Sequence, residues 1–127
     1  MADAHRNDQS ITAHDTERTR LQNLDLPGMT IESLDMLYRV ASSQVDVLQG
    51  VQNQPRCDDR LSGYFDRQIE CLDHQRQEIV EEIRSRQITD EPELNLKLAI
   101  LVDWAASCGE TATYILREVT GTIGKHG

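Results

Sequence analysis

Residues 90–121, DEPELNLKLAILVDWAASCGETATYILREVTG, decide the predicted fold. Apolar and small residues recur here at alternating steps of four and three, the spacing of a helical coiled-coil seam. Asp90 is a suitable N-cap, Pro92 fits the first turn, and Glu93 can complete a capping box. We therefore expect one continuous helix that ends near Gly121. Its seam holds Leu94, Leu98, Leu101, Ala105, Cys108, Ala112, Ile115 and Val119.

Two earlier helices show apolar residues at the same kind of spacing. Thr30 is a good N-cap for the first, which ends near Asn53. Asp58 or Ser62 can cap the second, an amphipathic helix with one strongly polar side. The first seam includes Leu34, Leu37, Tyr38, Ala41, Val45 and Leu48, and the second includes Leu61, Phe65, Ile69, Leu72, Ile79, Val80 and Ile83.

Short turns join these helices. Pro55 interrupts helical hydrogen bonding, so residues 54–57 form one turn, and residues 87–90 form the next. Loops of this length force neighbouring helices to run antiparallel. We predict an all-α fold, an up-down-up three-helix bundle over residues 29–124.

Residues 1–28 have a different composition from the rest of the chain. They are polar, show no sustained helical period, and end in a Pro-Gly pair. We expect a flexible polar tail in which Leu21, Leu24 and Leu26 can anchor the end against the bundle.

The composition is acidic, with 13 Lys and Arg against 22 Asp and Glu and a formal net charge of −9. This balance argues against DNA or RNA phosphates as direct partners. No stretch approaches the ~20 apolar residues that span a bilayer, and the first residues lack the apolar run of a signal peptide. We expect a cytoplasmic protein without membrane contact, whose cysteines Cys57, Cys71 and Cys108 are reduced.

The first and third predicted helices carry more apolar surface than one seam requires. A second stripe on the first helix holds Met29, Met36, Val40, Val47 and Val51, and one on the third holds Leu96, Ile100, Trp104 and Ile115. Two interpretations stay open. The stripes widen the core face of a single chain, or they form an interface, because small domains often gain stability by self-association.

The second interpretation predicts a homodimer. Its interface, or that with another protein partner, holds Met36, Val40, Val47, Ile100, Trp104 and Ile115. We expect Trp104→Glu or Ile100→Glu to give a folded or partly folded monomer, and His74→Glu on the polar face of the second helix to change nothing.

Candidate chemistry is sparse. Cys71 and His74 have a spacing that permits two ligands on one metal, but a zinc site needs at least three protein ligands. Cys57 precedes a helix start, yet the carboxylates of Asp58 and Asp59 oppose formation of a thiolate, and Cys108 in the seam is expected to be a small core residue. We predict no enzyme, no metal and no cofactor.

Arg76 falls on the core side of the second helix, between apolar residues. A buried charge must be paired. The preferred interpretation is that the stem packs while the guanidinium reaches water. The alternative is an ion pair with Asp35 or Glu32 on the first helix.

The expected function is a small acidic helical protein-interaction or regulatory module that acts through its first and third helices and self-associates. One alternative is a helical bundle that binds a small ligand or metal. Another is an acidic inhibitor of a nucleic-acid-handling protein, since a charge of −9 on a small chain accelerates encounter with a basic site.

Overall fold

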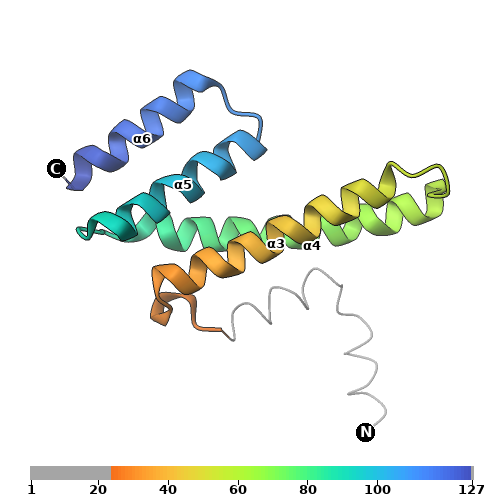
Figure 1. Ribbon diagram of the computed structural model, residues 1–127, viewed down its shortest axis with the longest axis horizontal. Helices are drawn as coiled ribbons and strands as arrows, with labels where there is room; N and C mark the ends of the chain where they lie inside the picture. Colours follow the sequence, from red (N-terminus) through yellow and green to blue (C-terminus); the bar gives the residue numbers. More distant parts are fainter. Residues whose placement is uncertain (1–23, 127) are drawn as a thin grey trace, which may run out of the picture.

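The computed structural model describes residues 24–126, and within that range every regular element is helical (Figure 1). The elements are the 3-10 turn η1 (Leu26–Gly28), α3 (Ile31–Gln52), α4 (Asp59–Ser85), α5 (Glu91–Ser107) and α6 (Ala112–His126). The all-α prediction is confirmed for this part of the chain. Residues 1–23, to which most of the expected flexible tail belongs, lie outside the described residues.

The predicted starts of the first three helices are confirmed. At each start a side-chain oxygen of the N-cap accepts a hydrogen bond from the backbone N–H three residues on, at 3.1 Å for Thr30, 2.9 Å for Asp58 and 3.2 Å for Asp90. Each bond satisfies an N–H group that has no partner within its helix. The chain therefore turns at the two places where the sequence predicts turns.

The third predicted helix is in fact two helices, so the prediction of a three-helix bundle is wrong. α5 ends at Ser107, and Gly109 adopts a φ of 77°, in the left-handed region that favours glycine. The N–H groups of Gly109 and Glu110 donate to the carbonyl oxygens of Ala106 and Ala105, each at 3.0 Å. This pair of bonds is the Schellman motif that closes a helix.

α6 begins immediately after this turn. Thr111 accepts a hydrogen bond from the backbone N–H of Tyr114 at 3.2 Å, as an N-cap does. The spacing of four and three continues across the turn by coincidence, which is why the sequence pattern predicts one helix. Cys108, expected in the core, is exposed at the end of α5.

The helices are arranged around α5. α3 and α4 form a long antiparallel hairpin, α5 packs against both near the end of α4, and α6 lies alongside α5 (Figure 1). An ion pair of 3.0 Å between Arg84 and Glu118 joins α4 to α6. Because α5 has neighbours on more than one side, it is apolar around most of its circumference.

The core occupies only one end of the hairpin. Tyr38 from α3, Ile83 from α4 and Leu101 from α5 meet there. From residue 46 to residue 70, by contrast, no side chain is buried. The full core cluster is Ile31, Leu34, Tyr38, Ile79, Val80, Ile83, Ile88, Ile100 and Leu101.

Two cations close the core end. Lys97 is only 2% exposed, and its Nζ donates to the carbonyl oxygens of Arg86 at 2.6 Å and Arg84 at 3.4 Å. These carbonyls at the end of α4 lack helical partners, so Lys97 caps that helix from another one. The guanidinium of Arg86 donates to the carbonyl oxygens of Leu26 at 2.8 Å and Pro27 at 3.2 Å, which fixes η1 against the bundle.

Two glycine substitutions are expected to change stability in opposite directions. Neither Gly109 nor Gly50 would bring an added Cβ within 4 Å of another group. Gly109→Ala should lower the free energy of unfolding by about 1 kcal/mol, because alanine is strained at positive φ. Gly50→Ala, inside α3, should raise it by about 0.5–1 kcal/mol. Urea denaturation of both variants checks this, and equal effects at the two sites would contradict the assigned end of α5.

Candidate interaction surface

The outer side of α3 carries exposed apolar residues. The side that faces the core is set by Ile31, Leu34, Tyr38, Ala41 and Val45, which are buried at steps of three and four. Apolar residues that fall between these steps must point elsewhere. Met36, Val40 and Val47 are accordingly 67%, 53% and 65% exposed.

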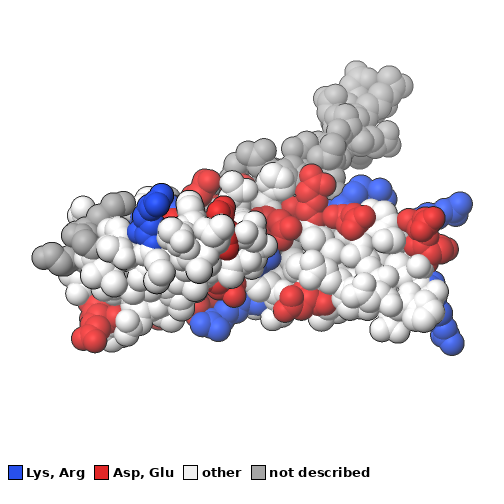
Figure 2. Space-filling view, turned by 90° about the horizontal axis from the view of Figure 1, so that it is seen from above, with Lys and Arg blue, Asp and Glu red and all other residues white. Residues whose placement is uncertain are grey.

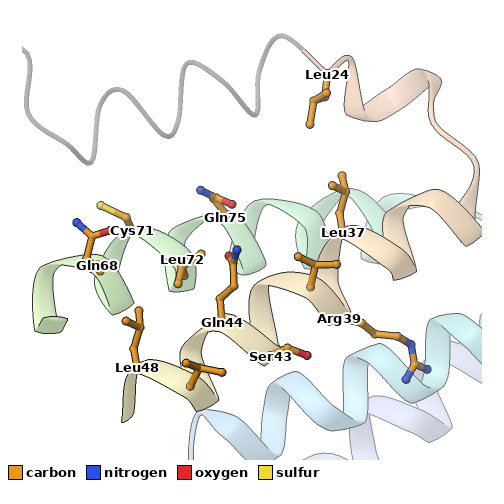
Figure 3. Close-up of a pocket in the computed structure, with 12 residues that line it drawn as sticks. Leu24, Leu37, Arg39, Ser43, Gln44, Leu48, Gln68, Cys71, Leu72 and Gln75 are labelled. Atoms are coloured by element: carbon orange, nitrogen blue, oxygen red, sulfur yellow. The ribbon is translucent and has the colours of Figure 1, made fainter. Parts of the chain in front are cut away.

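A groove between α3 and α4 borders this outer side (Figure 3). It encloses about 830 Å³, and Leu37, Leu48 and Leu72 give it apolar walls. Leu24, which precedes η1, lies over one end of the groove. The remaining lining residues are Arg39, Val40, Ser43, Gln44, Val47, Gln68, Cys71 and Gln75.

The α4 wall of this groove was not singled out from the sequence. The sequence pattern places Leu72 in the core seam of its helix and singles out Cys71 only as a possible metal ligand with His74. In the structure Cys71 is buried and Leu72 half-buried, and both line the groove. The signal in the sequence is weak, because glutamines at 68 and 75 interrupt the apolar pattern.

The structure separates the residues expected to form one interface. Met36, Val40 and Val47 are exposed on α3, whereas Ile100 is 2% exposed within the core. Trp104 is half-buried and packs against that core, and Ile115 is half-buried on α6. The physical reason is that α5 packs between the α3–α4 hairpin and α6, so its second stripe is used within the chain. The expected shared patch of the first and third helices is not formed by the described residues.

Arg76 joins three helices through a cluster of polar side chains in which Arg76 and Tyr38 are buried and their carboxylate partners are about half exposed. Its side chain is 8% exposed, and the guanidinium donates to Asp73 at 3.2 Å, Ser107 at 3.1 Å and Tyr38 at 3.3 Å. Its Cζ also lies 5.2 Å from the ring centre of Tyr38 and 5.1 Å from that of Trp104, within range of cation–π attraction.

Both expectations for Arg76 are therefore wrong. The guanidinium does not reach water, and its ion pairs are with Asp73 and, at 3.9 Å, Asp103. Asp35 instead pairs with Arg39 on its own helix at 2.9 Å. The spacing of apolar residues correctly places Arg76 on the core side of its helix. It does not predict how α5 lies across the hairpin, and α5 supplies Asp103 and Ser107.

Tyr38 lies in the same cluster as Arg76, and its pKa is shifted by its surroundings. Its hydroxyl donates to Asp103 at 2.5 Å. Burial and this hydrogen bond raise the pKa of Tyr38 from 10.0 to about 12, although Arg76 acts in the opposite direction.

This shift predicts a pH dependence of stability. The folded state holds the proton of Tyr38 up to about pH 12, whereas the unfolded chain releases it near pH 10. The contribution of Tyr38 is thus complete below pH 10 and lost as the pH rises towards 12. In a spectrophotometric titration, Tyr38→Phe should remove a tyrosine transition near pH 12. Loss of a transition near pH 10 instead would contradict the buried hydrogen bond.

The remaining candidate ligands do not come together. Cys57 is half-buried, and Cys108 is exposed. Within residues 24–123, whose side chains the structure describes, no group of three or more His, Cys, Asp or Glu is placed to hold a metal ion. In the same range no helix has both the length and the apolar character needed to cross a membrane.

No family model matches the chain, and neither a curated protein nor a solved structure matches it. The function must therefore be inferred from the geometry of the described surfaces.

Proposed function

We propose that this chain is a small acidic helical protein-interaction or regulatory module that acts through the outer side of α3 and the groove beside it. The observation that supports the proposal most directly is the exposure of Met36, Val40 and Val47 along one side of a helix whose other side already has a complete core. Contiguous exposed apolar surface on a small protein is typical of a binding site.

The groove fits a helical partner. Its leucine walls can receive apolar side chains that recur at three and four residues, and its glutamines can hydrogen-bond at the rim. The expected partner is therefore an amphipathic helix of a protein.

Photocrosslinking in the native host tests this proposal. A benzophenone amino acid replaces Val47 at the groove, and a matched variant carries it at Gln77 on the exposed outer side of α4. We expect an adduct of defined mass from position 47 and none from position 77. No adduct from position 47, or the same adducts from both positions, would contradict the proposal.

A further inference from the structure

α3 carries a second seam beside the one that faces the core. Leu37, Val40, Gln44, Val47 and Val51 follow one another at steps of three and four, the spacing of a coiled-coil contact. Leu37, Val40, Gln44 and Val47 line the groove, and Val51 is 38% exposed. The described chain places no helix of its own against this outer seam.

Apolar residues of α3 lie symmetrically on either side of Gln44, with Val40 and Leu48 four residues away and Leu37 and Val51 seven residues away. Antiparallel pairing of two α3 helices about a two-fold axis at Gln44 sets Val40 opposite Leu48 and Leu37 opposite Val51. The two Gln44 side chains then meet, and each amide has both a donor and an acceptor for the other. A single polar residue within an apolar seam is a known way to set register.

The half of the α3–α4 hairpin that lies away from the core, residues 46–70, has no core of its own. No side chain from residue 46 to residue 70 is buried, and Leu61 and Tyr64 are 45% and 49% exposed. Two helices alone do not enclose a core, whereas two hairpins packed face to face form a four-helix bundle. A second copy would supply the two missing helices.

The small net charge of residues 46–70 is more compatible with a second copy of the chain than with a strongly basic partner. Residues 46–70 carry five acidic and three basic side chains, whereas the whole chain has a net charge of −9. Figure 2, which views the molecule from the side of α5 and α6, also shows acidic and basic side chains interspersed with uncharged surface there. Two copies can therefore approach at residues 46–70 with little of the repulsion that their total charge would cause.

The area that the α3–α4 hairpin can offer to a second copy is close to that of a stable interface. α3 has 22 residues and is about 33 Å long. With each helix about 10 Å wide, the face of the α3–α4 hairpin is about 20 Å across and measures roughly 600 Å² in projection. Accessible surface exceeds projected area, so this approaches the ~800 Å² per partner of a stable interface.

From these observations we infer that the groove is occupied by α3 of a second copy, with the two-fold axis at Gln44 and a four-helix bundle formed by the two α3–α4 hairpins. This inference rests on the proposed function and names its partner. It differs from the dimer expected from the sequence, because Ile100 and Trp104 take no part in the contact.

Sedimentation equilibrium of the full chain at micromolar concentration tests the inference. The wild type should have the mass of two chains, and the double variant Val40→Glu, Val47→Glu the mass of one with unchanged helical circular dichroism. The matched control is Leu116→Glu on α6, since Leu116 is 66% exposed and Val47 is 65% exposed. It should remain a dimer. A monomeric wild type, or dissociation by Leu116→Glu alone, would overturn the inference.

Charge exchange at the axis tests the geometry without altering the core. Gln44 is exposed in the single chain, so Gln44→Glu and Gln44→Lys should both fold. Each variant alone should dimerise at least tenfold more weakly than the wild type, because like charges meet, and an equimolar mixture should recover the dimer. Failure of the mixture to recover it would exclude an axis at Gln44.

The two proposals fail in different ways. A monomeric wild type that still crosslinks through position 47 to a protein of another mass would leave the proposed function standing and remove the second copy. Absence of any adduct from position 47 would contradict both.

Discussion

We expect Ile100→Glu to prevent folding. Ile100 is 2% exposed and belongs to the core cluster that α5 forms with α3 and α4. A carboxylate there would be buried without a partner, at a cost of several kcal/mol. This is a large part of the ~5–15 kcal/mol that stabilises a small domain. Circular dichroism should show loss of helix at neutral pH.

Val40→Glu is the matched control. It introduces the same carboxylate at a position on α3 that is 53% exposed. The single chain should keep its helices, with a change in the free energy of unfolding below about 0.5 kcal/mol for the monomer. If Ile100→Glu yields a stably folded monomer, then Ile100 does not lie in the core described above.

We expect Arg76→Ala to lower the free energy of unfolding by about 2 kcal/mol, because it removes the hydrogen bonds and cation–π contacts of a buried guanidinium whose carboxylate partners are about half exposed. The substitution leaves a gap between the rings of Tyr38 and Trp104 and takes a hydrogen bond from Ser107. Arg76→Lys should recover only part of the loss, because an ammonium cannot reproduce the planar fork of the guanidinium.

Arg84→Ala is the control for Arg76. Both arginines lie on α4 and both form ion pairs, but the side chain of Arg84 is 45% exposed and that of Arg76 is 8% exposed. An exposed ion pair contributes less than about 1 kcal/mol. Denaturation of the two variants in urea gives the comparison, and equal losses would show that Arg76 does not organise the three helices.

The local structure of this chain was predictable because it depends on neighbouring residues. The type and position of Thr30 and Asp90 identify them as caps, Asp58 is one of two candidates with Ser62, and all of Thr30, Asp58 and Asp90 cap helices in the structure. The break at Gly109 also has a local signal, a glycine followed closely by Thr111 as the next cap. Because the apolar spacing of four and three continues past Gly109, the sequence pattern predicts one helix instead of two. Such spacing does not require the helix to be continuous.

The candidate surface was predictable only in part, because exposure depends on which helices become neighbours. Met36, Val40 and Val47 were correctly placed on a second stripe of their helix. For Ile100 and Trp104 the same reasoning failed, since burial of α5 on more than one side is a property of the whole fold. The partners of Arg76, such as Asp103, could not be predicted from the sequence for the same reason.

Distances between spin labels on two copies test most directly whether α3 pairs with itself about Gln44. Single labels are placed at Gln49 or at Glu32, both exposed on α3, in a chain whose native cysteines are replaced. An antiparallel pair separates the two copies along the helix axis by about 15 Å at position 49 and about 36 Å at position 32, from the 1.5 Å rise per residue. Pulsed electron resonance should therefore give a distinctly longer distance for position 32. Equal distances at both positions, or no dipolar signal, would contradict the account.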